Sequence, residues 1–245
     1  MRNALKFDVA ARSRMPTWAE ALRAFIGQAD DLGVLVAVNG VVGNNTHRRL
    51  DPGEFRGFAL SDGVAPMVFV NGADSKAAQM FTLAHELAHI WLGESALSDP
   101  DKTRGPVHAT ERWANEVAAE MLVPRSAFQD IFDQNESLDA ALHRIARHFK
   151  VSTLVVLRRI RDLGEITAQE FWSAYDAELQ RLRAVRRGAG GDFYLTESAR
   201  VGKRFGRALI ASTLEGNTLY RDAMRMLGIS KVETFHEFSH SLGIG

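Results

Sequence analysis

Residues 74–93, DSKAAQMFTLAHELAHIWLG, form the stretch that decides the fold of this chain. Between its first residue and Gly93 it contains no proline or glycine, and most of its side chains are apolar. This composition predicts one buried helix. Asp74 or Ser75 would cap its N-terminus, and Gly93 would end it.

The predicted helix carries the pattern His-Glu-x-x-His at His85, Glu86 and His89. Residues four positions apart project from the same helical face, so the two imidazoles can bind one metal ion. Zinc prefers about four ligands in tetrahedral geometry, and this pair supplies two of them. Glu86 is rotated by about 100° from His85. It would therefore reach a water on the ion and serve as general base.

A third ligand is predicted on the next helix, residues 110–123, TERWANEVAAEMLV, which ends before Pro124. Glu111 lies on the same stripe of that helix as Asn115. Glu116 and Glu120 lie on a different stripe, which we expect to face solvent. Small residues would let the two helices approach closely: Ala114, Ala118 and Ala119.

The alternative is that these histidines are ordinary core residues. His-Glu-x-x-His arises by chance in roughly one or two chains per hundred of this composition. However, burial of unpaired polar groups costs about 1–3 kcal/mol each, and a metal ion removes that cost. The chain has no cysteine, so a metal must rest on His, Asp or Glu. Two imidazoles and one carboxylate make zinc the expected ion, with manganese left open.

A second His-Glu-x-x-His stands near the end of the chain, at His236, Glu237 and His240. Only residues 241–245 follow, and none of them is Asp, Glu or His. Glu233 could share a face with His236, but nothing would enclose such a site. We therefore predict an amphipathic terminal helix whose histidines face solvent.

The whole chain has 245 residues, with 30 basic and 30 acidic side chains. Because the net charge is zero, no global field favours nucleic acid or membrane. The N-terminus lacks the apolar core of a signal peptide, and no stretch approaches the ~18–20 apolar residues of a membrane span. We therefore expect a cytoplasmic protein without a membrane partner.

The order of predicted elements indicates an α+β fold. A helix at residues 17–31 precedes a strand at 34–40. Runs at 55–60 and 65–71 flank a Ser-Asp-Gly turn and predict a hairpin, so we expect a small antiparallel sheet of about three strands. With the two predicted metal-binding helices, these elements would form a metal-binding domain over residues 1–125.

A mostly helical extension is predicted after Pro124. Residues 137–164 read as two helices joined by a short turn, which has the proportions of a helix-turn-helix, and residues 126–187 would form this extension. The linker RRGAGG, residues 186–191, leads to a C-terminal module, 188–245, with the short strand DFYLT and three helices.

The helix-turn-helix-like segment raises the question of DNA binding. Arg158, Arg159 and Arg161 could contact phosphates, with Arg181, Arg183, Arg186 and Arg187 nearby. Apolar residues fill much of the second helix, however, and leave few side chains to read bases. Docking against the catalytic domain or a protein partner is the favoured interpretation, and direct DNA binding remains the alternative.

Residues 54–99, together with ERWANEVAAEMLVP at 111–124, resemble the ImmA/IrrE family of zinc-dependent peptidases. Residues 149–164 and 218–230 also look like segments of its larger members. The resemblance implies a gluzincin-like domain with zinc on His85, His89 and Glu111 and with Glu86 as general base. It also implies an intracellular enzyme that cleaves a helix-turn-helix repressor, often encoded beside it, in mobile elements, stress responses or toxin–antitoxin systems.

Two further features concern the substrate. The strand APMVFVN, which contains Val68, Val70 and Asn71, precedes the metal helix and could be an edge strand that pairs with an extended peptide. The alternative is that it lies inside the sheet. His108 could contact the oxyanion, although a surface loop histidine is the more ordinary interpretation.

Two functions therefore compete. One is a zinc endopeptidase that inactivates a regulatory protein such as a repressor or antitoxin. The other is a non-catalytic DNA- or protein-binding regulator that retains the zincin scaffold. The predicted ligand set with Glu86 beside an open position favours the first, because a structural zinc needs no such carboxylate.

Overall fold

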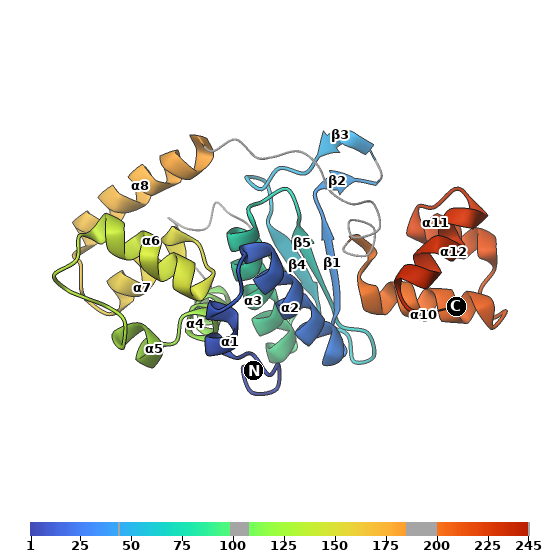
Figure 1. Ribbon diagram of the computed structural model, residues 1–245, viewed down its shortest axis with the longest axis horizontal. Helices are drawn as coiled ribbons and strands as arrows, with labels where there is room; N and C mark the ends of the chain where they lie inside the picture. Colours follow the sequence, from blue (N-terminus) through green and yellow to red (C-terminus); the bar gives the residue numbers. More distant parts are fainter. Residues whose placement is uncertain (44, 99–107, 185–199, 245) are drawn as a thin grey trace.

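The computed structural model describes residues 1–43, 45–98, 108–184 and 200–244 (Figure 1). In chain order its elements are α1 (Val9–Ser13), α2 (Trp18–Asp31), β1 (Leu35–Asn39), β2 (Val41–Val42), β3 (Asn45–Arg49), β4 (Gly57–Leu60), β5 (Met67–Asn71), α3 (Lys76–Leu92), β6 (Ala96–Ser98), α4 (Ala109–Leu122), α5 (Arg125–Gln129), α6 (Leu138–Phe149), α7 (Thr153–Asp162), α8 (Ala168–Ala184), α10 (Lys203–Leu214), α11 (Tyr220–Leu227) and α12 (Val232–Ser241). Among the described residues, no helix is long and apolar enough to cross a membrane.

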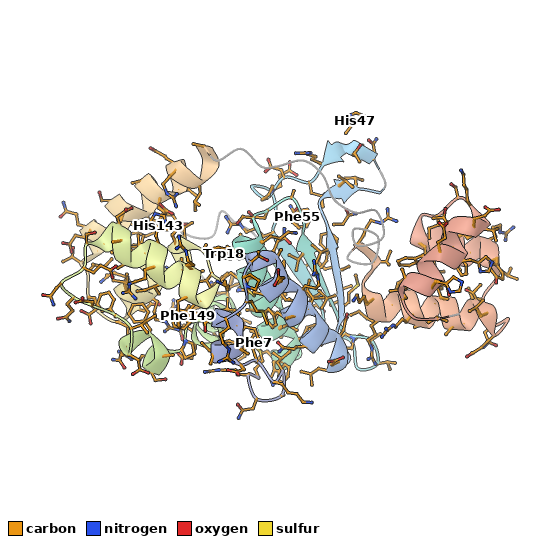
Figure 2. The ribbon with its side chains drawn as sticks, in the orientation of Figure 1. Phe7, Trp18, His47, Phe55, His143 and Phe149 are labelled. Atoms are coloured by element: carbon orange, nitrogen blue, oxygen red, sulfur yellow. The ribbon has the colours of Figure 1, made fainter. Side chains whose placement is uncertain are left out.

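The predicted α+β class is confirmed, but the sheet is mixed rather than antiparallel. Its strand order is β1-β5-β4-β6. The predicted hairpin of β4 and β5 is antiparallel, whereas β1 and β5 are parallel. The difference arises because β5 inserts between β1 and β4, so that β4 is not the neighbour of β1. Strands β2 and β3 form a separate two-stranded sheet that carries His47 away from the core (Figures 1 and 2).

Helices α2 and α3 cover one face of the sheet (Figure 1). Alternate positions of the central strands, such as Val68 and Val70 on β5, are buried, as expected for strands with one face on a core. Phe25 of α2 is also fully buried, and its ring packs at 4.7 Å from that of Phe7. Met80, Leu83 and Leu87 of α3 belong to the same buried cluster, which packs α3 against α2 and the sheet.

The helical extension shares its core with the N-terminal half of the chain. One cluster of buried apolar residues runs from Leu5 to Phe171. Trp18, at the start of α2, donates a hydrogen bond from Nε1 to the carbonyl of Val151, between α6 and α7, at 3.1 Å. The domain boundary predicted at residue 125 stays a prediction. The segments before and after this residue pack against each other.

The predicted C-terminal helices are confirmed as α10, α11 and α12 within residues 200–244. They have a separate core: Leu209, Ile210, Ala223, Leu227, Ile229, Phe235, Phe238 and Leu242. This module contacts β1, because a Cβ built on Gly202 would lie 2.5 Å from the carbonyl oxygen of Val36. The predicted strand at 192–196 and the linker at 186–191 lie outside the described residues.

Asp30 lies at this junction and gives a testable pH dependence. Its carboxyl is buried, and burial raises its pKa from 3.8 to about 6, although Arg204 opposes the shift. Because the folded state resists ionisation of Asp30, this group lowers stability as pH rises from about 4 to 6. We therefore expect Asp30→Asn to raise the free energy of unfolding by on the order of 1–2 kcal/mol at pH 7.5.

Urea denaturation at several pH values checks this prediction. The gain from Asp30→Asn should shrink as the pH falls through 6 and disappear near pH 4, where the wild-type carboxyl is protonated in the folded state. A variant that is less stable than wild type at pH 7.5, or a gain that does not change with pH, would contradict it.

Candidate metal centre

The helix predicted from residues 74–93 is confirmed as α3. The Ser75 hydroxyl, rather than the Asp74 carboxylate, caps it by accepting a hydrogen bond from the Ala78 amide at 3.2 Å. Gly93 ends the helix in the left-handed conformation, with φ of 78°. Its positions 79, 80 and 82–89 are buried, so the histidines are held on a rigid element.

Helix α4 packs closely against α3, as its small residues predict. Ala114 and Ala118 are fully buried, and so are Ala84 and Ala88 on α3. Alanine side chains at a helix contact allow a short separation of the axes. As a result Glu111, in the first turn of α4, reaches the histidines of α3.

The three predicted ligands converge. Nε2 of His85 lies 3.1 Å from Nε2 of His89. The Glu111 carboxylate places Oε2 at 3.3 Å from His85 Nε2 and Oε1 at 3.6 Å from His89 Nε2. Within the described ranges, this is the one cluster of His, Cys, Asp or Glu that could hold a metal ion.

The geometry of these atoms fits a shared cation. Zinc–nitrogen bonds are about 2.0–2.1 Å long, so two imidazole nitrogens at a tetrahedral angle lie roughly 3.3 Å apart. The observed Nε2–Nε2 distance of 3.1 Å is close to this value. His85 and His89 are 5% and 1% exposed, so few solvent molecules compete for their lone pairs. The donor set therefore fits a zinc-type ion.

Asn115, one turn beyond Glu111, orients His85. Its Oδ1 lies 3.1 Å from Nδ1 of His85. Because a carbonyl oxygen accepts, Nδ1 carries the proton and donates it, which leaves the Nε2 lone pair directed at the cluster. Asn115 was placed on the Glu111 stripe from the sequence but was given no role. Its position four residues after Glu111, on the same face of the helix, is the feature of the sequence that could have indicated this role.

We expect Asn115→Ala to weaken zinc binding by about 10–100-fold, the usual effect of removing an outer hydrogen-bond partner of a metal-binding histidine. A competition titration with a chelating dye measures it. Asn115→Asp keeps the acceptor and should restore most of the affinity. An unchanged zinc affinity in Asn115→Ala would show that His85 needs no such partner.

The electrostatics of His89 favour the neutral form that binds metals. Burial lowers the pKa of His89 below its usual value, the neighbouring His85 lowers it further, and Glu111 opposes both effects. His89 is therefore neutral near pH 7. A neutral imidazole keeps the lone pair that a metal ion needs.

Glu86 lies beside strand β4. Its side chain is fully buried, and its Oε1 would lie 3.2 Å from a Cβ built on Gly57. The same Cβ would be only 2.6 Å from Cγ2 of Thr82 and 2.7 Å from the carbonyl oxygen of Phe69. The absent side chain of Gly57 thus allows β4 to approach α3 and Glu86. No sequence pattern had singled out this glycine.

Gly57→Ala is expected to destabilise the fold by about 1–3 kcal/mol, because the added methyl overpacks this contact. Gly63→Ala is the matched control, since a Cβ built on Gly63 meets nothing within 4 Å. Chemical denaturation of both variants measures the effect. Equal stability of the two variants would contradict the close packing at Gly57.

The expectation that the strand APMVFVN is an exposed edge is wrong. As β5 it lies between β1 and β4, so both sides of its main chain are paired. Val68 and Val70 are buried in the core. Asn71 donates from Nδ2 to the carbonyl of Phe55 at 3.0 Å and accepts at Oδ1 from the Ala73 amide at 2.9 Å. These residues support the fold rather than contact a peptide.

Three further polar side chains of α4 and its N-cap lie outside the metal cluster. His108 is exposed at the N-cap of α4 and is not part of the metal cluster. Glu116 is exposed, as expected. Glu120 is about half exposed and forms an ion pair with Arg159 of α7 at 3.1 Å. This ion pair links α7 of the extension to α4, the helix that carries Glu111.

The second His-Glu-x-x-His lies on α12. His236, Glu237 and His240 are exposed, whereas Phe235 and Phe238 point into the small C-terminal core. No other carboxylate or imidazole of the described residues joins His236 and His240 in a metal cluster. The predicted amphipathic terminal helix is confirmed.

The helix-turn-helix-like segment has the predicted two helices, α6 and α7, with Lys150 in a left-handed turn, φ 51°. The second helix is mostly buried rather than exposed. Arg159 pairs with Glu120, and Arg158 lies 3.3 Å from Asp162. The apolar side chains of α7 pack into the main core of the chain, and DNA binding by its arginines stays a prediction.

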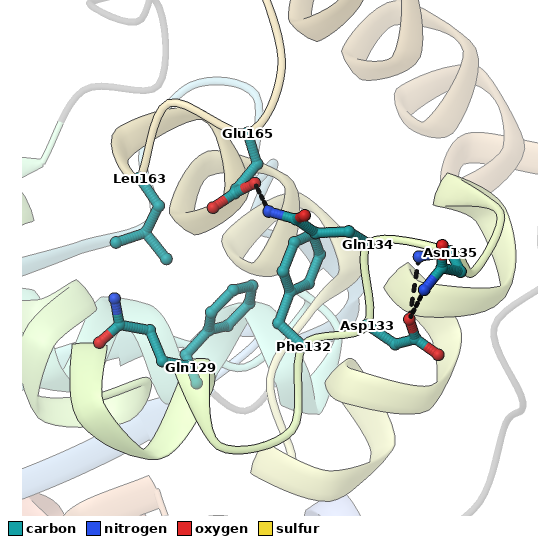
Figure 3. A pocket seen from close by; sticks show the side chains of 8 residues that line it. Gln129, Phe132, Asp133, Gln134, Asn135, Leu163 and Glu165 are labelled. Atoms are coloured by element: carbon teal, nitrogen blue, oxygen red, sulfur yellow. Dashed lines mark hydrogen bonds between the residues drawn. The ribbon is translucent and has the colours of Figure 1, made fainter.

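A cavity of about 450 Å³ lies in the extension, away from the metal cluster (Figure 3). Phe132 and Leu163 supply apolar walls, and Glu165 accepts a hydrogen bond from Gln134 at 2.9 Å across the opening. The residues around it are mostly exposed and polar. Nothing in its lining resembles the chemistry at His85.

The fold and the metal cluster between α3 and α4 define the class of the protein as a metallopeptidase domain. Residues 29–161 match the IrrE N-terminal-like domain of peptidase family M78. This match covers more than half of the 245-residue chain. The chain belongs to this family. Residues 201–241 match a domain of unknown function, DUF8813. No curated protein and no solved structure matches the chain.

Proposed function

We propose that this protein is a zinc-dependent endopeptidase that cleaves a specific regulatory protein. The observation that carries the proposal is the convergence of His85, His89 and Glu111, all from two packed helices, with Glu86 one residue from the first ligand. Membership of the M78 family supports the same class of reaction.

Zinc is the proposed ion because two neutral imidazoles and one carboxylate suit it better than magnesium or calcium, which prefer oxygen ligands. His85, His89 and Glu111 would hold the ion. When bound, zinc acts as a Lewis acid that activates water and polarises a peptide carbonyl. Three protein ligands would leave the ion able to bind a water or a substrate oxygen for this chemistry.

Glu86 would carry the proton transfers. Its carboxylate would accept a proton from the attacking water and later deliver it to the leaving peptide nitrogen. Burial in a low-dielectric environment next to β4 holds this carboxylate in one position. Asn115 would keep His85 in the tautomer that binds the ion, so its role is positioning.

The proposed substrate is a helix-turn-helix repressor or antitoxin-type partner encoded near this gene. The family resemblance supports this proposal, with roles in stress response or toxin–antitoxin control as its consequence. The second helix of the extension is mostly buried in the core of the chain, which leaves few of its side chains to read DNA bases. The protein would thus change transcription by removing a regulator.

The test is to purify the helix-turn-helix protein encoded nearest to this gene and incubate it with the full-length chain and zinc. We expect one or a few discrete cleavage products, identified by mass spectrometry, with wild type and none with Glu86→Gln. An intact repressor in every reaction with zinc-loaded protein would contradict the proposed substrate. Products that also form with Glu86→Gln would reveal a contaminating protease.

A further inference from the structure

The cavity in the helical extension has no role in the proposed reaction, and its lining indicates what it could bind (Figure 3). Its walls come from the end of α5, the loop at residues 130–136, and the end of α7 with the residues that follow. The lining consists of two phenylalanines, one leucine, three side-chain amides and two carboxylates. Its volume of about 450 Å³ falls within the roughly 300–1,000 Å³ of ligand sites in proteins.

One wall of the cavity is aromatic and held by the core. The rings of Phe128 and Phe132 are stacked, with their centroids 5.1 Å apart and an angle of 24° between their planes. Phe128 is fully buried in the main core, which fixes the pair, whereas Phe132 and Leu163 are only partly buried. This side of the cavity therefore offers an apolar surface that a planar or slender group can cover.

The polar part of the lining is negatively charged. Asp133 and Glu165 are the two carboxylates, and none of the eight described residues around the cavity is lysine, arginine or histidine. Glu165 accepts a hydrogen bond from the Gln134 side chain at 2.9 Å, and Asp133 accepts one from the backbone amide of Asn135 at 2.9 Å. Both donors are neutral, so they orient the carboxylates without neutralising their charge.

Arg144 of α6 contacts the same loop but does not line the cavity. Its guanidinium donates hydrogen bonds to the Glu136 carboxylate at 2.6–3.1 Å and to the carbonyl of Ile131 at 3.0 Å. This arginine is therefore bonded outside the cavity. The charge of the lining favours a positively charged ligand from outside the chain.

We propose that this cavity binds one arginine side chain of the protein substrate, away from the metal centre. The inference rests on the proposed function for the identity of the partner. A guanidinium is planar, so it can stack on Phe132 while its N–H groups reach the Glu165 carboxylate and the lining amide oxygens. Its methylene stem would cover Leu163. A lysine ammonium has no plane to stack, so arginine fits this wall better. Proteins that bind DNA phosphates carry such exposed arginines.

A titration with N-acetyl-arginine amide tests the site and needs no catalysis. We expect the probe to cause saturable NMR shifts in the amide signals of residues 128–135 and 163–165 of the full-length protein. N-acetyl-citrulline amide has nearly the same shape but no charge, and it should bind about tenfold more weakly, because hydrogen bonds to charged groups are the stronger ones. The absence of saturable shifts, or equal affinity for the two probes, would overturn the inference.

Glu165→Gln removes the negative charge and nearly keeps the shape of the side chain. Glu165 is exposed, so the variant should fold like the wild type. We expect its affinity for the arginine probe to fall about tenfold. Glu116→Gln makes the same change on an exposed position of α4 that does not line the cavity, and it should bind the probe like the wild type. An unchanged affinity in Glu165→Gln would contradict the proposed site.

Cleavage of the repressor tests whether the substrate uses the cavity. In Glu165→Gln we expect KM to rise about fivefold while kcat stays near the wild-type value, because the cavity would contact the substrate but not the reacting groups. An unchanged KM would show that the substrate does not use the cavity, and the inference would be wrong. If the zinc-loaded wild type cleaves no repressor, the proposed function fails, and the probe titration then decides by itself whether the cavity binds arginine.

Discussion

Replacing Glu86 with glutamine is expected to slow cleavage of the partner repressor by about 10²–10⁴-fold, the usual contribution of a general acid–base group. Glutamine has nearly the same shape but cannot accept a proton from water. Because Glu86 is not among the three predicted ligands, the variant should bind one zinc ion with wild-type affinity. The measurements are initial cleavage rates by gel densitometry and zinc content by elemental analysis.

Glu116→Gln is the matched control for this variant. It makes the same change of charge on an exposed position of α4, on a stripe that does not face the histidines. We expect wild-type cleavage and zinc content. If Glu86→Gln kept wild-type activity, or if it lost its zinc, the assignment of Glu86 as the general base would be incorrect.

Glu111→Gln is expected to lower zinc affinity by more than about 10²-fold, beyond the effect of losing an outer partner. The substitution removes the negative charge that faces His85 and His89 at 3.3 and 3.6 Å. Its amide keeps the volume of the side chain, and the position is partly exposed, so the fold should survive. Circular dichroism confirms folding, and a chelator competition titration gives the affinity.

The second His-Glu-x-x-His supplies the control for Glu111→Gln within the same chain. The double variant His236→Ala with His240→Ala removes both of its imidazoles from the exposed face of α12. This variant should still bind one zinc ion with wild-type affinity. Loss of zinc in this variant, with retention in Glu111→Gln, would reverse our choice between the two motifs.

Local pattern was enough to predict the helices of the site. The spacing of His85 and His89, the cap at Ser75 and the stop at Gly93 depend on residues within one helix. Glu111 could be selected because it shares a stripe with small residues that indicate a close helix contact. These features depend on residues that are close in the sequence, so they can be predicted from the sequence pattern alone.

The sheet could not be predicted to the same extent, because strand order depends on contacts between distant segments. The insertion of β5 between β1 and β4 placed Val68 and Val70 in the core and made the predicted edge an interior strand. Likewise, the role of Gly57 follows from its approach to Glu86, twenty-nine residues later, which no periodicity reveals. The pairing of β6 with β4 also joins two segments about forty residues apart, which no local pattern reveals.

A crystal structure of the zinc-loaded protein, with anomalous scattering measured at the zinc edge, tests the central claim most directly. We expect one strong peak bonded to Nε2 of His85, Nε2 of His89 and a carboxylate oxygen of Glu111, each at about 2.0–2.2 Å, and no fourth protein ligand. A peak elsewhere, or a Glu111 side chain turned away from the two imidazoles, would contradict the account.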